Sequence, residues 1–273
     1  MSVSIDYISP SALKSWEYDA ERWFLQRFCG RSFAQTAPMA VGSAFDAYVK
    51  GYISEYLFGR VAGFGFEELF ESQVDAMHRD TALVAGGVCF DKYKSIGSLA
   101  RLMEMLSSCS GVRLEHQITR VVDGVPLLGR PDLIFTCADG TGILDWKVNG
   151  YYSAASPAVG YADCGGVAHK RYVVAGRFGG MSYCNGSHMW QDQLVTYHKI
   201  IGSEGFSIIE QLAWRNGEMR VATHRNMLTD NGLMARYHRM WDHVQAGHLF
   251  PDMSLADSRD RQVTLSFTAY GEL

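Results

Sequence analysis

The sequence lacks a long apolar run, paired cysteines and a secretory signal, and each absence narrows the class of protein. No stretch reaches the roughly 18 consecutive apolar residues of a transmembrane helix. The first residues, MSVSIDYISP, do not show a basic segment followed by an apolar one. The six cysteines are scattered without a C-x-x-C pair, which favours reduced thiols over a disulfide framework or a zinc site. We therefore expect an intracellular protein.

The chain also has little excess charge of either sign. Its formal net charge is -4 and its pI is about 6.1, which excludes a basic nucleic-acid coat protein. Any contact with nucleic acid would come from local patches. No internal repeat, low-complexity tract or linker is visible in the 273 residues, and the hydrophobic fraction of 47% is enough for a substantial core. The length fits one large domain or two small ones, and nothing marks a boundary between two.

Residues 127–150, LLGRPDLIFTCADGTGILDWKVNG, carry charges where core residues would be expected. Two apolar segments flank a turn-like stretch; the first opens with Pro131-Asp132, and the second carries Asp145 and Lys147. Side chains alternate between the faces of a strand, so Asp145 and Lys147 share one face and the apolar residues beside them fill the other. Burying such charges is costly unless they are paired or hold a metal. A surface hairpin with an ion pair worth ~0–1 kcal/mol is the alternative.

Two clustered carboxylates would offer hard oxygen ligands to a cation such as Mg²⁺, and the carbonyl of Trp146 could add another. A lysine beside them would position an attacking water or stabilise the extra charge on a phosphate, while the metal lowers the pKa of the water. The companion Asp132 on the preceding segment favours this interpretation over a simple ion pair. The pattern of Asp132, Asp145 and Lys147 is therefore typical of phosphodiester hydrolysis.

Apolar periodicity and turn residues predict an α+β protein with a mixed sheet. Asp123-Gly124 and Asn216-Gly217 are typical of hairpin turns. We expect helices at 9–28, 41–58, 67–78, 92–107, 190–201 and 230–245, and strands at 112–122, 127–136, 142–148, 206–214 and 218–223.

Polar residues outside the hairpin are further candidates. Asp46 lies on or beside the apolar stripe of its predicted helix, as a third metal ligand or a solvated boundary residue. Glu115 could be an outer ligand, although a solvated strand face accounts for it more simply. Gln193 and Tyr197 are one helical turn apart and either hold a phosphate or a base or cap the edge of the core.

Residues 149–189 are rich in Gly, Ser and Tyr, and a loop of this length in a compact domain is more often functional or mobile than accidental. Lys170, Arg171 and Arg177 are interleaved with aromatic residues and would suit a surface that follows a nucleic-acid backbone. A solvated loop is the alternative.

Together these motifs resemble those of the PD-(D/E)XK nuclease superfamily, and within it the RecB-like branch that includes phage and CRISPR-associated exonucleases. Gly-Arg-Pro-Asp at 129–132, Asp-Trp-Lys at 145–147 and Gln-x-x-x-Tyr at 193–197 occur in the family's order. SPSALKSWEYDAERWFL resembles the family's N-terminal helix, and VGSAFDAYV resembles its Gly-x-x-x-His helix. The resemblance covers most of the chain from Ser9 to about Thr223, without 149–189 and the C-terminal tail.

The resemblance implies a restriction-endonuclease-like core, a central mixed β-sheet flanked by helices, in a single domain of residues 1–273. An N-terminal helical region (9–107) would precede a core (112–225) with a long insertion (149–189), and a C-terminal helix and tail (230–273) would follow. It implies a metal-dependent DNA nuclease, and more narrowly a DNA exonuclease in recombination, repair or phage DNA processing. A non-catalytic DNA-binding or complex-forming module, a structure-specific endonuclease and a nucleotide phosphohydrolase are the alternatives.

By the same resemblance, Asp132 and Asp145 would bind the metal with help from the Trp146 carbonyl. Lys147 would orient or activate the nucleophilic water. The side chains that would shape the site and contact the DNA strand are Gln193 and Tyr197. The expected partners are DNA and either a second copy of the chain or a recombination protein, with no membrane, in the cytoplasm of a bacterial or phage-infected cell.

The chain departs from the family pattern at two places. Asp46 stands where the family usually has His, so it would remain a hard ligand and shift the preference from Mn²⁺ toward Mg²⁺. Members with an iron–sulfur cluster carry a cysteine in the N-terminal helix and three more after the core. Here Asp19 occupies the equivalent region and no cysteine follows Cys184, so no iron–sulfur cluster is expected. Gly42 would allow a close approach at the start of its helix.

Overall fold

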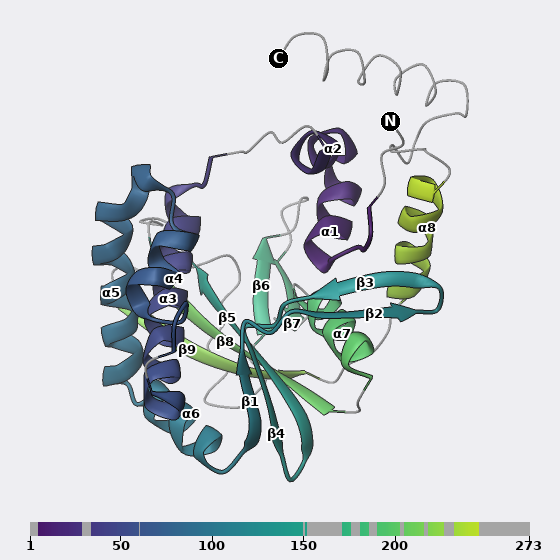
Figure 1. Ribbon diagram of the computed structural model, residues 1–273. Coiled ribbons are helices and arrows are strands. Elements are labelled where there is room, and N and C mark those ends of the chain that lie inside the picture. The colour runs from purple at the N-terminus through teal and green to yellow at the C-terminus, as the bar shows by residue number, and fades with distance from the viewer. Residues whose placement is uncertain are drawn as a thin grey trace.

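The computed structural model describes residues 5–28, 34–59, 61–149, 151, 171–175, 181–185, 190–202, 205–215, 218–226 and 232–245. They form an α+β fold with a mixed central sheet flanked by helices, as the sequence predicts (Figure 1). The helices are α1 (Pro10–Tyr18), α2 (Ala20–Phe28), α3 (Ala37–Phe58), α4 (Phe66–Gln73), η1 (Ala76–His78, a 3-10 helix), α5 (Arg79–Ser95), α6 (Ser98–Ser107), α7 (Gln191–Ile201) and α8 (Leu233–Gln245). The strands are β1 (Ser110–Leu114), β2 (Ile118–Val122), β3 (Val125–Gly129), β4 (Leu133–Cys137), β5 (Gly140–Asn149), β6 (Arg171–Ala175), β7 (Met181–Asn185), β8 (Gly205–Arg215) and β9 (Glu218–Asn226). Within these residues no helix combines the length and the apolar character needed to cross a bilayer.

The central sheet has the strand order β1-β4-β5-β8-β9. The pairing of β5 with β8 is parallel, and the other neighbours are antiparallel. The β8–β9 hairpin confirms the strands predicted at 206–214 and 218–223. Because β5 is hydrogen-bonded along both edges, the side chains that it carries are held in fixed positions.

Helices α3, α5 and α6 cover one face of the sheet, and α7 covers the other (Figure 1). On the first face, Phe45 of α3 belongs to the same buried cluster as Leu144 and Trp146 of β5. On the second face, Leu194 of α7 packs with Ile143. The faces of β5 therefore alternate as predicted, with the residues between the charged positions buried against the α3 layer.

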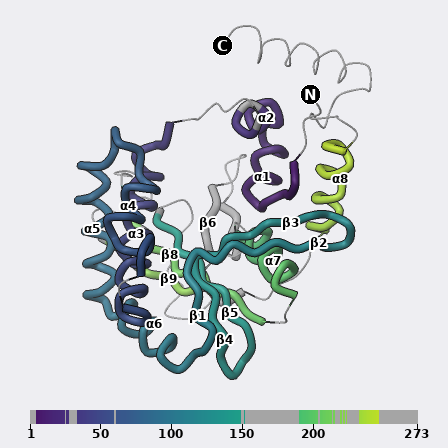
Figure 2. The backbone as a smooth tube through the Cα atoms, viewed as in Figure 1, coloured from purple at the N-terminus to yellow at the C-terminus, as the bar shows by residue number. Residues whose placement is uncertain are grey.

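Strands β2 and β3 form a separate two-stranded sheet that packs with α1, α2 and α8 in a second core, away from the α3–α6 layer (Figure 2). The prediction of continuous strands at 112–122 and 127–136 is wrong, because the chain leaves the main sheet after β1 and returns to it at β4. Glu115 has a positive φ of 50°, which interrupts the extended backbone directly after β1. Pro131, which lies between β3 and β4, has no N–H to donate to a neighbouring strand. The predicted turn at Asp123-Gly124 is confirmed, with φ values of 49° and 82°.

The single helix predicted at 9–28 is also wrong, because the chain forms α1 and α2 with a break at Asp19. The backbone of Asp19 is extended, with φ -159° and ψ 92°. Its carboxylate accepts a hydrogen bond from the backbone N–H of Arg22 at 2.9 Å, so that Asp19 ends one helix and caps the next.

The helices predicted at 67–78 and 92–107 are divided differently, into α4 with η1, and into α5 and α6. Residues 79–91 of α5 were missed because Gly86 and Gly87 lower the helix propensity of this segment. Packing explains Gly86: a Cβ atom there would lie 2.5 Å from the Cβ of Ala44 on α3. Helix α3 begins at Ala37, before the predicted 41, and α7 confirms the helix predicted at 190–201. The predicted start of the last helix, 230, lies outside the described residues.

Candidate functional site

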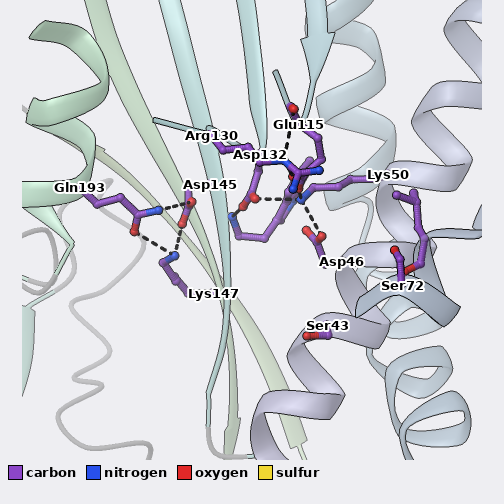
Figure 3. Close-up of polar contacts among 12 residues, drawn as sticks. Ser43, Asp46, Lys50, Ser72, Glu115, Arg130, Asp132, Asp145, Lys147 and Gln193 are labelled. Atoms are coloured by element: carbon purple, nitrogen blue, oxygen red, sulfur yellow. Dashed lines mark hydrogen bonds and ion pairs between the residues drawn. The ribbon is translucent and has the colours of Figure 1, made fainter. Parts of the chain in front are cut away.

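The pairing of β4 with β5 brings the carboxylates of Asp132 and Asp145 together (Figure 3). Leu133 pairs with Leu144, so the register sets Asp132 opposite Asp145, and opposed residues of antiparallel strands lie close on one face. The ammonium of Lys147 forms an ion pair with the Asp145 carboxylate, of which only 2% is exposed. The three residues that the sequence singles out therefore lie in one place.

Asp132 stands between the two halves of the site. Its Oδ2 atom accepts a hydrogen bond from the backbone N–H of Trp146 at 3.0 Å. Its Oδ1 atom accepts another from Nζ of Lys50 at 2.8 Å. The first contact ties Asp132 to β5, and the second ties it to Lys50 of α3 (Figure 3).

Helix α3 contributes Asp46 and Lys50, which lie one turn apart. The Lys50 side chain is 1% exposed, and its Nζ atom donates to Oδ2 of Asp46 at 2.6 Å. The same ammonium forms ion pairs with Asp132 and with Glu115. Three carboxylates from three separate segments therefore converge on one buried lysine.

The sequence interpretation favoured a solvated strand face for Glu115, and the structure shows that this is wrong. Its side chain is only 10% exposed and lies in the carboxylate cluster. Its other oxygen accepts from Nε of Arg130 at 2.6 Å. Glu115 was missed because it lies in the break between β1 and β2, where strand alternation no longer assigns a face. For Lys50, the signal was present as a lysine four residues after Asp46 on a buried helix edge, but it was given no role.

Asp46, Glu115 and Asp132 are arranged as a possible metal site, because each offers an oxygen and these oxygens lie within 4.8 Å of one another. An all-oxygen donor set of this kind fits a hard divalent cation. Asp46 and Asp132, which the sequence predicts as ligands, both belong to this cluster, and their role as ligands stays a prediction. Asp145 adjoins it across the β4–β5 register, and the part assigned to the Trp146 carbonyl stays a prediction.

Helix α7 braces the β5 end of the site through Gln193. Its amide Nε2 donates to Oδ1 of Asp145 at 3.1 Å and to the Tyr197 hydroxyl at 2.9 Å, while its Oε1 accepts from Nζ of Lys147 at 3.4 Å. The Tyr197 hydroxyl in turn donates to the carbonyl of Arg130 at 3.3 Å. Gly129 makes room for this ring, since a Cβ atom there would lie 2.6 Å from it.

The environment separates the acidities of the carboxyl groups. Burial, reinforced by the charge of Asp132, raises the pKa of Asp145 to about 7. Burial likewise raises the pKa of Asp46 to about 7, although Lys50 opposes it. Burial alone would also raise the pKa of Asp132, but the ammonium groups of Lys50 and Lys147 outweigh it and hold that pKa below its ordinary value. Asp132 is therefore the more acidic member of the Asp132–Asp145 pair.

Both lysines keep their charge. Burial would lower the pKa of Lys50, but Asp132, Asp46 and Glu115 raise it well above the ordinary value. The pKa of Lys147 is raised for the same reason, with Asp145 as the main opposing charge to burial. Lys147 can therefore donate hydrogen bonds and stabilise negative charge, but it is poorly suited to accept a proton.

Some expected residues cannot be placed in the site. Lys170 and Arg177 lie outside the described residues, and of Arg171 only the backbone, in β6, is described. A Cβ atom at Gly42 would meet no atom of the described residues within 4 Å, and the close approach expected there stays a prediction.

An open pocket of about 540 Å³ adjoins the site between α1, α2 and the β2–β3 hairpin. Arg27 and Arg130 contribute cationic groups to its lining, and Ser9, Ser11 and Gln117 contribute uncharged polar groups. Arg130 also pairs with Glu115, so its guanidinium links the pocket to the carboxylate cluster.

Comparisons with known proteins show the fold. No protein-family model matches the chain, and no curated protein matches it significantly in sequence. Its structure is similar to that of a protein from Eubacterium rectale named "putative exonuclease", with a TM-score of 0.50, 16% identity, and coverage of 89% of this chain and 82% of that chain. The solved structure of SSO0001 aligns with 12% identity over 82% of this chain and 84% of that one, but its TM-score of 0.31 supports no argument.

Proposed function

We propose that this chain is a divalent-metal-dependent nuclease that hydrolyses phosphodiester bonds in DNA. The observation that carries the proposal is the contact between the carboxylate cluster and the Asp145–Lys147 pair through Asp132. The motif resemblance to PD-(D/E)XK nucleases and the fold shared with a protein named as an exonuclease support it. We extend it to an exonuclease that uses Mg²⁺ and acts in recombination, repair or phage DNA processing.

The donor set fits a hard cation, which Asp132 and Asp145 would hold beside the carboxylates of Asp46 and Glu115. A bound divalent cation would supply Lewis-acid activation of water and neutralise charge on the phosphate. Water would attack phosphorus in line, forming a P–O bond as the bond to the leaving nucleoside oxygen breaks. The proton that the water loses would pass to solvent, and the leaving oxygen would gain one from solvent.

Lys147 and Gln193 would act on this reaction from the β5 side. The Lys147 ammonium would donate to the attacking oxygen or to a non-bridging phosphate oxygen and stabilise the growing negative charge. Gln193 contacts both Lys147 and Asp145, so it would fix the position of the Lys147 ammonium relative to the metal ligands. The cationic pocket at Arg27 and Arg130 would carry the neighbouring part of the strand.

A non-catalytic DNA-binding module is the second candidate. It is disfavoured because carboxylates that face a phosphate backbone weaken binding and serve only a site that also holds a cation.

Cleavage of end-labelled linear DNA and of a covalently closed circle, with Mg²⁺, Mn²⁺ or chelator, tests the proposal. We expect loss of linear DNA that is abolished by chelator and by Asp145→Ala or Lys147→Ala. The matched control is Lys94→Ala, because Lys94 is a half-exposed lysine of α5 paired with Asp91. Full activity of Lys147→Ala would overturn the assignment, cutting of the circle would indicate an endonuclease, and binding without cleavage would favour the binding module.

A further inference from the structure

The buried ammonium of Lys50 occupies a position that suits a cation. It contacts Asp46, Glu115 and Asp132, the same carboxylates whose oxygens lie within 4.8 Å of one another. Without a positive charge among them, these groups would repel one another in a poorly solvated place. Lys50 therefore balances part of the negative charge of the cluster.

The Lys50 side chain is held tightly in the interior, because only 1% of it is exposed and its ammonium donates to Asp46 at 2.6 Å and to Asp132 at 2.8 Å. Withdrawing the ammonium would break buried ion pairs, which is costly. These contacts favour binding of a metal ion beside Asp132 with Lys50 still in place.

The balance of charge points the same way. The carboxylates among the described residues of the site are Asp46, Glu115, Asp132 and Asp145, and the cationic side chains are Lys50, Lys147 and Arg130. With all four carboxylates ionised, as they would be beside a bound cation, these groups leave a deficit of one positive charge. One divalent cation together with one phosphate group restores neutrality, whereas a second divalent cation would leave an excess of positive charge in a buried place.

We propose that Lys50 is a built-in cation that takes the place of a second metal ion and restricts this site to one divalent cation, bound by Asp132 and Asp145. The inference rests on the proposed function, since it concerns the metal of that same site. Lys50 is a positioning residue in this scheme: it holds three carboxylates but does not touch the reacting phosphate.

The test is the number of Mn²⁺ ions bound per chain, measured by the electron paramagnetic resonance of free Mn²⁺ on the full-length protein. We expect one ion for the unchanged chain and two for Lys50→Met, which keeps the length of the side chain but removes its charge. The matched control is Lys94→Met, which removes a lysine of α5 that pairs with Asp91 outside the site and should still bind one ion. One ion in Lys50→Met, or two in the unchanged chain, would overturn the inference.

Thermal unfolding in chelator gives a second readout. We expect a large fall in melting temperature for Lys50→Met in chelator and its recovery with Mn²⁺. The double variant Asp46→Asn with Lys50→Met removes one charge of each sign and should fold in chelator and bind one ion, even if the single variant fails to fold. If the double variant fails to fold in chelator, or Lys50→Met is as stable there as the unchanged chain, Lys50 does not balance the cluster. Chelator-sensitive DNA cleavage by the unchanged chain would leave the proposed function standing in either case.

Discussion

Gln193 connects α7 to both charged residues of β5. Its amide group donates to Asp145 and accepts from Lys147, so one uncharged side chain satisfies an acid and a base together. A carboxylate or an apolar residue at this position could satisfy only one of the two or neither. Gln193 therefore orients the side chains of Asp145 and Lys147 without adding a charge to the site.

Replacing Gln193 by Leu should lower kcat for DNA cleavage by about 10- to 100-fold, the usual effect of losing a residue that orients a metal-site ligand. KM should change little, because the residue positions the charged groups and would not supply most of the DNA contacts. Steady-state kinetics with Mg²⁺ would measure both. The control is Asp192→Asn, since Asp192 is next in sequence but pairs with Arg236 on α8. Equal kcat values for the two variants would contradict this role.

Glu210 on β8 is a second buried acid, and it gives a pH dependence that is independent of the candidate site. It accepts hydrogen bonds from the hydroxyls of Tyr93 and Thr223, each at 2.7 Å. Burial raises the pKa of Glu210 above its ordinary value of 4.5, and these hydrogen bonds reduce the shift only in part. Since the folded protein holds this proton more tightly than the unfolded chain, stability is present below the ordinary pKa and is lost as pH rises through the raised one.

Glu210→Gln should therefore gain in free energy of unfolding, relative to the unchanged chain, as pH rises above about 4.5 toward neutrality. Urea unfolding in chelator across this range would show it. Glu104→Gln on α6 is the control, because Glu104 is exposed. A difference between Glu210→Gln and the unchanged chain that is independent of pH would contradict the argument.

At the scale of elements, the crossing of α3 and α5 sets the position of the α3 half of the site. The helices approach so closely at Gly86 that an added Cβ would lie 2.9 Å from the backbone nitrogen of Phe45. Phe45 precedes Asp46 directly. A displacement of α3 at this crossing would therefore move Asp46, which holds Lys50 beside Asp132.

Gly86→Ala should destabilise the protein by about 1–3 kcal/mol, the usual cost of overpacking a core. It should also weaken Mn²⁺ binding, because moving Asp46 would move the Lys50 ammonium that contacts Asp132. Gly87→Ala is the matched control: its new Cβ would lie 3.3 Å from the hydroxyl of Tyr48, the far end of a flexible side chain. That variant should be neutral or more stable by up to about 1 kcal/mol, because Ala is the better helix former. Urea unfolding of the two variants should separate them, and equal effects would contradict the close crossing.

Local patterns in the sequence account for the elements that were predicted correctly. Alternation assigns Asp145 and Lys147 to one face of β5, and Asp123-Gly124 fixes the hairpin turn, because both signals lie within a few residues. The break at Glu115 could not be predicted in this way. Its conformation accompanies an ion pair with Lys50, a residue far away in sequence, and no local pattern reports such a contact. For the same reason the site was anticipated on β4 and β5 but only in part on α3.

At the scale of the whole molecule, the central sheet and the β2–β3 sheet should differ in stability. Strand β5 has neighbours on both sides and lies between two helical layers, whereas β2 and β3 form a pair of their own. Backbone amides open most rarely where burial and hydrogen bonding are most complete. The central sheet is therefore expected to be the most persistent part of the fold.

Hydrogen exchange followed by mass spectrometry should show the slowest exchange in peptides covering Ile143–Val148 and Ile208–Leu212, which pair in register. Peptides covering β2 and β3 should exchange sooner, because their sheet has only two strands and β2 is largely exposed. Equal protection of the two regions would show that the fold opens as one unit.

The parallel pairing of β5 with β8 has a consequence for how the protein is made. Thr141 pairs with Gly205, so during synthesis β5 leaves the ribosome well before its partner exists. Until then one edge of a central apolar strand is open to pairing with other chains, and the nascent chain is at its most prone to aggregate. Gln193 has not yet been added for much of the same interval, so Asp145 and Lys147 lack their brace. A chain that stops before α7 would thus carry Asp145 and Lys147 on β5 without the side chain that orients them.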